Sequence, residues 1–262
     1  MSSRLRAIAT DTLSIVERGF YDGPAGRVDL AAAVAAAVAG TRMFDPDEPL
    51  GPPKPVGDAP PVIEVTQESS VAAVLRLGAP VACLVFASAR NPGGGFRNGA
   101  QAQEESLARA SALYAAITAA PQFYAHHRAD PDLAYSDRVI HSRGVPVFRD
   151  NKGTLLPAAV PVTFLTAAAP NAGAMLDKTP ERVAEVPQLL RRRARRVLDI
   201  ARAFGDRRLV LGAWGCGVFR NDPATVARIF AEELRTPRGF THVTFAVLDE
   251  RTCEIFRQVV TA

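Results

Sequence analysis

Two continuous apolar segments that run directly into glycine-rich turns constrain the fold of this chain more than any other feature. The first, PVACLVFAS at residues 80–88, leads into NPGGG at residues 91–95. The second, RRLVLGAWGCG at residues 207–217, has the same form. Apolar runs of this length, bounded by turn residues, are typical of strands that are buried on both faces. Such strands need helices on both sides of their sheet.

Strands and helices alternate from residue 62 to the end of the chain. Short apolar runs predict four further strands, at residues 62–66, 143–150, 160–169 and 241–248. Apolar residues at helical spacing predict helices at residues 69–77, 104–119, 179–204, 222–234 and 251–260. We expect the segment 121–144 to be irregular. This alternation predicts an α/β fold with a parallel or mixed sheet covered on both faces.

The first 60 residues have a different character. Residues 3–18 and 28–39 predict helices, the second of them capped by Asp29 and stopped by Gly40. The stretch FDPDEPLGPPKPVGDAPP is too rich in proline for regular structure, so it predicts a linker or an extended segment wrapped over the surface. We therefore expect an amino-terminal helical and proline-rich extension at residues 1–60 and a catalytic domain at residues 61–262.

Composition limits the classes of partner. The 31 basic and 27 acidic residues give a net charge of only +4, too small to indicate direct nucleic-acid binding, while a pI near 9.2 suits an anionic ligand. The three cysteines form no CxxC pair, which favours a reducing compartment. The amino terminus lacks a secretory apolar core, and no apolar run could cross a bilayer. We expect a cytoplasmic monomer that does not associate with membranes.

The glycine-rich turns are the first candidates for a binding site. In α/β sheets, ligands bind at the carboxyl ends of the strands. Successive amides in a glycine-rich turn form a concave anion site, and helix amino termini add partial positive charge. Two such turns on one sheet edge suit a diphosphate that joins two sugars. Each turn is equally explained as a tight connection whose glycines supply positive φ.

Two common phosphate-binding motifs are excluded. A dinucleotide-binding GxGxxG needs glycine at its sixth position, where the two turns have Asn98 and Arg220. A Walker A motif is also excluded, because no Gly-Lys-Ser or Gly-Lys-Thr triplet occurs in the chain.

Glu104 and Glu105 follow the first turn, where a helix begins. Adjacent helical residues point about 100° apart, so the two cannot serve as the carboxylate pair of an ordinary glycosidase. One of them at most can protonate a leaving group. A helix amino terminus stabilises a carboxylate and opposes acid catalysis, whereas burial and a neighbouring ligand diphosphate favour it. By composition alone, both could simply complement the helix dipole.

Other residues give weaker indications. Cys216 could be a nucleophile, but its flanking glycines indicate a small residue in a crowded loop, and no histidine partner is identifiable. His126 and His127 point apart as neighbours and predict a surface loop, so we expect no metal site. The run RRRARR at residues 191–196 lies on a helix whose other side carries an apolar stripe, so we expect a solvated arginine face that could attract a polyanion.

The segment GGGFRNGAQAQEE at residues 93–105 resembles the signature of poly(ADP-ribose) glycohydrolases, in which three glycines and a short spacer precede Gln-Glu-Glu. The preceding Asn-Pro and GAWGCGVFRNDP at residues 212–223 resemble the compact bacterial branch of that family, which is built on a macrodomain. The resemblance extends from residue 62 to the carboxyl terminus. It implies a three-layer αβα macrodomain with a mixed sheet and shifts the interpretation of the glutamates towards catalysis.

The resemblance also implies roles for single residues. Glu105 matches the catalytic acid, which protonates the 2′-oxygen of the departing polymer and then activates the attacking water. Glu104 matches the glutamate that holds ribose hydroxyls, and Asn91 a ligand of the distal ribose. Further substrate-binding positions are Gly93, Gly94, Gly95, Gln103, Gly215, Cys216, Gly217, Val218 and Phe219, of which Phe219 presses against ribose and diphosphate. Macrodomain geometry assigns adenine contacts to residues 247–249 and Phe256.

The implied activity is hydrolysis of ribose–ribose O-glycosidic bonds in poly(ADP-ribose), with release of ADP-ribose and without metal or cofactor. Poly(ADP-ribosyl)ated proteins would be the substrates. The alternatives are a macrodomain that only binds ADP-ribose, one that removes a single ADP-ribose from protein, and a nicotinamide oxidoreductase. Retention of both glutamates argues against the first alternative.

Overall fold

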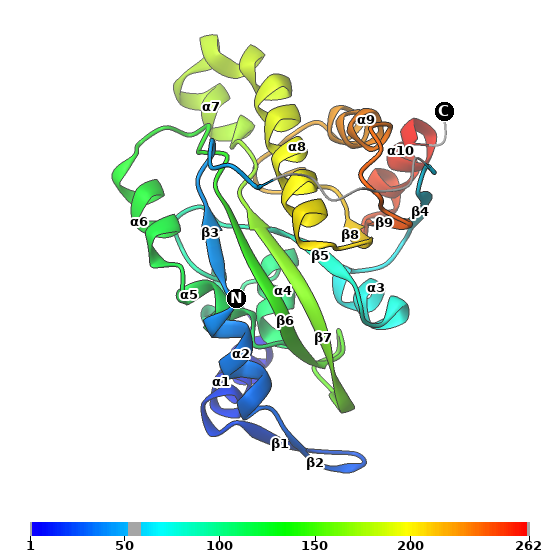
Figure 1. The fold of residues 1–262 in the computed structure, drawn as a ribbon. Helices are drawn as coiled ribbons and strands as arrows, with labels where there is room; N and C mark the ends of the chain where they lie inside the picture. Colours follow the sequence, from blue (N-terminus) through cyan, green and yellow to red (C-terminus); the bar gives the residue numbers. More distant parts are fainter. Residues whose placement is uncertain (1, 52–58, 261–262) are drawn as a thin grey trace.

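A computed structural model describes residues 2–51 and 59–260, and within them seven strands form the central mixed sheet (Figure 1). The strand order is β3-β6-β7-β5-β8-β9-β4. Strands β4, β5, β7, β8 and β9 are parallel, and β6 is antiparallel to its neighbours β3 and β7. Their bounds are β3 Arg42–Phe44, β4 Val62–Thr66, β5 Ala82–Phe86, β6 Val139–Arg149, β7 Leu155–Ala167, β8 Arg208–Leu211 and β9 His242–Ala246.

Helices cover both faces of the sheet, as the apolar strands predict. On one face lie α2 (Ala31–Ala39), α3 (Ser70–Leu77), α4 (Gln103–Ala110), α5 (Leu113–Thr118) and α6 (Pro121–Ala129). On the other lie α7 (Ala172–Lys178), α8 (Val186–Phe204), α9 (Pro223–Leu234) and α10 (Glu250–Val260). Ala82 and Leu84 of β5 enter the second core, and Cys83 and Val85 enter the first. The predicted three-layer αβα architecture is confirmed. In the described ranges, no helix is long and apolar enough to cross a membrane.

The residues before position 61 contact the rest of the molecule extensively. Helix α1 (Ser3–Arg18) is followed by a hairpin of β1 (Phe20–Gly23) and β2 (Gly26–Asp29), and β3 joins the central sheet beside β6. Arg138 forms an ion pair with Asp45, which lies in the proline-rich stretch. Residues 52–58 of that stretch lie outside the described residues. The division of the chain at residue 60 stays a prediction.

The predicted helix over residues 28–39 is wrong at its start. Asp29 ends β2 and forms an ion pair with Arg27 instead of capping a helix, and α2 begins at Ala31. The helix does end at Gly40, as predicted.

Two predicted helices are interrupted, and one predicted irregular segment is regular. Ser111 breaks the helix expected at residues 104–119, because it forms a β-bridge with Val147 of β6. The helix expected at residues 179–204 is a 3₁₀ helix, η2 (Pro180–Glu185), followed by α8. Pro187 has no backbone N–H, so it cannot donate a helical hydrogen bond where the two join. The segment 121–144, expected to be irregular, contains α6 and the start of β6.

Candidate active site

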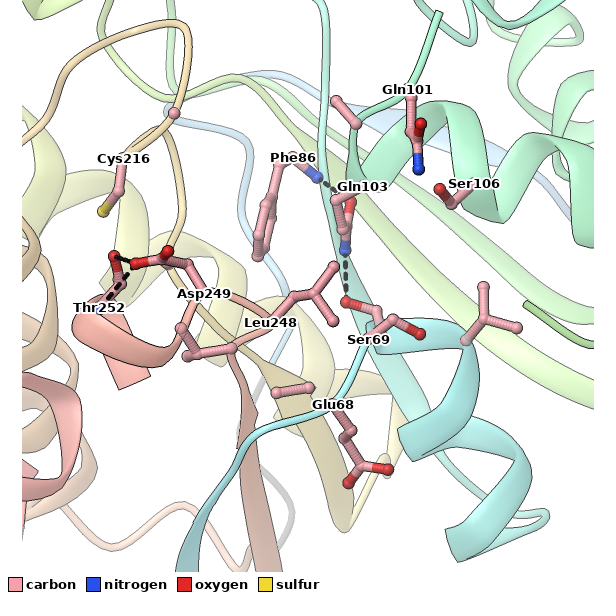
Figure 2. A pocket seen from close by; sticks show the side chains of 17 residues that line it. Glu68, Ser69, Phe86, Gln101, Gln103, Ser106, Cys216, Leu248, Asp249 and Thr252 are labelled. Atoms are coloured by element: carbon pink, nitrogen blue, oxygen red, sulfur yellow. Dashed lines mark hydrogen bonds between the residues drawn. The ribbon is translucent and has the colours of Figure 1, made fainter. Parts of the chain in front are cut away.

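The two glycine-rich turns lie on the same edge of the sheet. Strands β5 and β8 are parallel neighbours, so the turns that follow them meet at their carboxyl ends. The end of β9, the other neighbour of β8, completes this edge. A cavity of about 570 Å³ opens here. Its lining residues come from all three strand ends and from the starts of α3, α4 and α10, and they include Gly217. Figure 2 labels ten of the others: Glu68, Ser69, Phe86, Gln101, Gln103, Ser106, Cys216, Leu248, Asp249 and Thr252.

The first glycine turn closes tightly around the two glutamates. Its backbone folds back at Asn91, whose carbonyl accepts a hydrogen bond from the Gly94 amide at 2.9 Å. Gly94 has φ of 56°, and a Cβ atom there would collide with the Glu105 carboxylate and lie 3.3 Å from Glu104 Oε2. This position therefore needs glycine both for its left-handed backbone and for the space that the carboxylates fill.

Glu104 is buried, with only 3% of its surface exposed. Its Oε2 accepts a hydrogen bond from the Ser88 amide at 2.7 Å, and its Oε1 accepts one from the Gly93 amide at 3.1 Å. Burial raises the pKa of Glu104 to about 8, and the negative charge of Glu105 adds to the increase, while the two amides oppose it. Glu104 thus binds the glycine turn to the end of β5.

Glu105 is placed differently from its neighbour. It is half-buried, and its Oε1 accepts a hydrogen bond from the Gly95 amide at 3.0 Å. Among the described residues, its Oε2 atom has no hydrogen-bond partner. Arg109 lies four residues further along α4, on the same face, and donates to the Ala100 carbonyl at 2.6 Å. One oxygen of Glu105 is therefore fixed, and the other is available to a reacting molecule.

Gln103 holds the start of α4 against the sheet. Its Nε2 donates to the Leu84 carbonyl at 2.7 Å and to Ser70 Oγ at 3.0 Å, and its Oε1 accepts from the Phe86 amide at 2.9 Å. Figure 2 shows its side chain beside Phe86 in the wall of the cavity. Both N–H groups of its amide are used in these bonds, so toward a ligand in the cavity Gln103 offers only the second acceptor position of Oε1 and van der Waals packing.

Helix α1 supports the first turn from outside. The Ser2 amide donates to the Gly99 carbonyl at 3.2 Å, directly after the 3₁₀ turn η1 (Phe96–Asn98). Ala9 packs in one apolar cluster with Phe96 and Ala108. The amino-terminal helix thus contacts the segment that joins the triple glycine to the glutamates.

The second glycine turn is more open. Gly215 has φ of 73°, and a Cβ atom there would collide with Asn221. By contrast, a Cβ atom at Gly217 would meet no atom within 4 Å, and Val218 is 84% exposed. Phe219 is half-buried, and its ring packs on Tyr135 with the ring centroids 5.9 Å apart.

Comparison with known proteins identifies the family. The model of the family described as "Microbial-type PARG, catalytic domain" matches residues 9–150. The chain belongs to the microbial-type PARG family. It is 48% identical to the poly(ADP-ribose) glycohydrolase (PARG) of Thermomonospora curvata, with a TM-score of 0.93 and coverage of 98% of this chain and 100% of that one. The match to the same protein bound to the inhibitor ADP-HPD has a TM-score of 0.89, 48% identity and coverage of 98% and 99%.

A second PARG structure comes from Deinococcus radiodurans in complex with ADP-ribose. It is 48% identical, with a TM-score of 0.81 and coverage of 87% of this chain and 96% of that one. No curated protein matches the chain significantly. The PARG-family fold thus extends over almost the whole chain, and the predicted resemblance is confirmed.

Macrodomain geometry suggested adenine contacts at residues 247–249 and Phe256, and these contacts stay predictions. Residues 247–249 line the cavity. Phe256 does not, because it is fully buried and packs on Phe245 in the core. Sequence analysis missed Phe86 and Thr252, which also line the cavity of this PARG-family chain. The position of Phe86 at the end of a buried strand, next to the first turn, is the pattern that could have identified it.

The minor candidates have structural explanations. Burial raises the pKa of the Cys216 thiol to about 12, which disfavours the thiolate that a nucleophile needs. His127 is on helix α6 and buried, so its assignment to a surface loop is wrong. Burial lowers its pKa to about 4, and its Nδ1 lies 2.8 Å from the Phe123 carbonyl while its Nε2 lies 2.8 Å from Ser136 Oγ. Among the described residues, no group of three His, Cys, Asp or Glu side chains could hold a metal ion.

The arginine run on α8 is largely a solvated face, as predicted, with Arg193 as the exception: the side chains of Arg191, Arg192 and Arg195 are 43%, 59% and 57% exposed. Arg193 is fully buried and donates to Asp137 Oδ1 at 3.0 Å and to the carbonyls of Ala168 and Ala134 at 2.7 and 3.0 Å. Its neighbours bind carboxylates or carbonyls of the same chain: Arg191 binds Glu232, Arg192 binds Asp137, Arg195 binds Glu233, and Arg196 binds the carbonyls of Asp45 and Glu48. The predicted apolar stripe on the other side of α8 is confirmed.

Proposed function

We propose that this chain hydrolyses the ribose–ribose O-glycosidic bonds of poly(ADP-ribose) and releases ADP-ribose in the cytoplasm. The observation that carries the proposal is the pair of unlike carboxylates under the triple glycine. Glu104 is buried with both oxygens on backbone amides, and Glu105 is half-buried with one oxygen unpartnered among the described residues. Family membership and the ADP-ribose complex of the Deinococcus radiodurans relative support the same substrate class.

In the proposed reaction, Glu105 carries the proton. It donates that proton to the 2′-oxygen of the departing polymer as the bond from this oxygen to the anomeric carbon breaks. A water molecule then attacks the anomeric carbon, and the Glu105 carboxylate accepts the proton that the water loses. The acid is regenerated, and one water molecule is consumed for each bond cleaved.

A second catalytic carboxylate is not required. The transition state of glycoside hydrolysis resembles an oxocarbenium ion, and the diphosphate of the substrate supplies negative charge to stabilise it. Glu104, whose pKa burial raises to about 8, holds the glycine turn in shape through the amides of Ser88 and Gly93, and in this proposal it also hydrogen-bonds a ribose hydroxyl. In this proposal Asn91 and Gly93–Gly95 contact the distal ribose and diphosphate.

Most of the remaining predicted substrate-binding residues lie in the second glycine turn, of which Cys216 and Gly217 line the cavity. Gly215–Phe219 would form the second wall for the diphosphate, where Gly217 leaves its backbone uncovered. The cavity of about 570 Å³ would take the adenosine end of the ligand, between Phe86 and Leu248. Leu248 is 69% exposed, which fits an apolar side chain that a ligand covers.

The experiment is to measure ADP-ribose release from poly(ADP-ribosyl)ated protein by the wild type and by Glu105→Gln. We expect kcat to fall ~10²–10⁴-fold in the variant, because a general acid contributes about that much. Its affinity for ADP-ribose should stay close to that of the wild type. Near-normal turnover by the variant would remove Glu105 from the mechanism.

A matched control separates catalysis from an effect on the helix dipole. Glu250 is an exposed first-turn glutamate of α10, so Glu250→Gln removes a dipole-complementing charge outside the site. We expect wild-type kcat from this control. If the wild type releases no ADP-ribose, calorimetry with ADP-ribose decides between a binding module, which would retain affinity, and a chain without this ligand.

A further inference from the structure

Two strained backbone positions flank the ring of Phe219. Among the described residues, Tyr135 and Arg220 are the non-glycine residues with left-handed φ, at 57° and 54°. Arg220 follows Phe219 directly, and Tyr135 packs on the Phe219 ring from a distant part of the sequence. Non-glycine residues rarely adopt this region and persist there only where the surroundings impose it, often beside functional sites.

The surroundings of Tyr135 do impose its conformation. Asp132 is bound by Arg182 at 2.9 Å, and the carbonyl of Ala134 by the buried Arg193 at 3.0 Å. On the other side of Tyr135, the amide and hydroxyl of Ser136 contact His127 Nε2. Asp137 is paired with Arg193 and Arg192. The backbone is thus held at the residues directly before and after Tyr135, which leaves its own φ no freedom.

The ring of Tyr135 is held as firmly as its backbone. The His127 ring packs edge-on against it with centroids 5.8 Å apart, and the two hydrogen bonds of His127 fix that imidazole. The Tyr135 ring also packs on Phe219. Phe219 is held through its backbone as well, because its carbonyl accepts a hydrogen bond from the Gly173 amide of α7 at 2.9 Å.

We propose that Tyr135 is a positioning residue that fixes the Phe219 ring for contact with the ligand, and that the buried Arg193–Asp137 pair holds Tyr135 in place. This inference rests on the proposed function, in which Phe219 presses against the ribose and diphosphate. It also gives a role to the arginine run on α8. The buried Arg193 donates to the Ala134 carbonyl and to Asp137, on either side of Tyr135, and so fixes the segment that carries Tyr135.

Tyr135→Gly tests the role of the ring. Glycine adopts φ of 57° without strain, so this variant removes the ring and leaves the backbone path unchanged. We expect the Kd for ADP-ribose and the KM for poly(ADP-ribose) to rise about threefold to tenfold, the range that an aromatic contact supplies. kcat should stay within about twofold of wild type, because Tyr135 does not touch the reacting atoms.

Two further variants separate positioning from general packing. Tyr135→Phe keeps the ring and should bind ADP-ribose like the wild type; a loss equal to that of Tyr135→Gly would overturn the role of the ring. Phe219→Ala should weaken ADP-ribose binding by itself, and Tyr135→Gly should add nothing in that background. Additive losses would mean that Tyr135 acts independently of Phe219 and would overturn the proposal.

A control and the wild type complete the design. Phe204→Ala removes a partly exposed aromatic ring that stacks on His141, outside the site. We expect it to change Tm about as much as Tyr135→Gly does, while the Kd for ADP-ribose stays unchanged. If the wild type neither binds ADP-ribose nor releases it, the proposed function fails. If the wild type does both and Tyr135→Gly equals it in Kd and KM, only the inference about Tyr135 fails.

Discussion

The two glycine-rich turns follow neighbouring parallel strands, yet they are built in opposite ways. In the first, the space above Gly94 is filled by the carboxylates of Glu104 and Glu105, and amides of the turn donate to both side chains. In the second, the space above Gly217 is empty and Val218 faces solvent. The first turn is closed by residues 10 and 11 positions away, whereas the ring of Phe219 in the second is packed by Tyr135, more than 80 positions away.

This difference indicates a division of tasks. The first turn fixes the positions of two acidic groups, so its glycines are required by close contacts. In the second, Gly215 is also required by a close contact, with Asn221, but Gly217 leaves its backbone uncovered, and the single aromatic ring of this turn is supported from outside. Three substitutions test this interpretation, in order of decreasing expected effect.

Gly94→Ala should have the largest effect. The added methyl group would displace the Glu105 carboxylate, and alanine is strained at φ of 56°. We expect a loss of ~1–3 kcal/mol in the free energy of unfolding. Turnover should fall ~10²-fold or more, because a catalytic group misplaced by about 1 Å costs that much. Denaturant unfolding and the ADP-ribose release assay measure the two effects, and wild-type turnover would refute the close contact.

Glu104→Gln should change how stability depends on pH. The folded-state pKa of Glu104, about 8, is raised above its ordinary value of 4.5, so its contribution to stability is complete below pH 4.5 and is lost as pH rises to 8. The free energy of unfolding of the wild type should therefore fall relative to the variant across this window, by at most ~1.4 kcal/mol per pH unit. Parallel curves for the two proteins would contradict the burial of a protonated acid.

The exposed Glu250 provides the control for this measurement. Because its side chain remains in solvent, Glu250→Gln should follow the wild-type curve between pH 4.5 and 8.

Gly217→Ala should have the smallest effect on the fold. Its Cβ would meet no neighbouring atom, so we expect the free energy of unfolding to change by less than ~0.5 kcal/mol. A rise in KM with unchanged kcat would agree with a ligand that packs on this backbone. Destabilisation comparable to that of Gly94→Ala would remove the contrast between the two turns.

Local sequence patterns correctly predicted the elements whose formation depends on residues close to one another in the sequence. The apolar runs before the two turns predicted two buried strands, and both are confirmed; that they are neighbours in the sheet is shown only by the structure. The break at Ser111 could not be predicted in this way. It depends on a bridge to Val147, and such a long-range contact overrides helix propensity.

The same limit applies to buried polar residues. A run of arginines on a helix normally indicates a solvated face, and Arg193 is buried only because Asp137 and two carbonyls meet it. The helical position of Glu104 and Glu105 was predictable, but the structure brings both carboxylates to Gly94 instead of turning them apart. Their unequal burial was not predictable, because it depends on how the glycine turn folds back over them. The catalytic and binding roles of the site residues stay predictions.

The contact between Ser2 and Gly99 has a practical consequence for anyone who works with this protein. An affinity tag or fluorescent protein fused before Ser2 would lie beside the 3₁₀ turn that precedes the glutamates. A fusion at that end would therefore perturb the segment between the triple glycine and the glutamates, and it would alter the measured rate of ADP-ribose release. Helix α10, which ends at Val260 on the layer opposite α4, offers the attachment point that leaves this segment untouched.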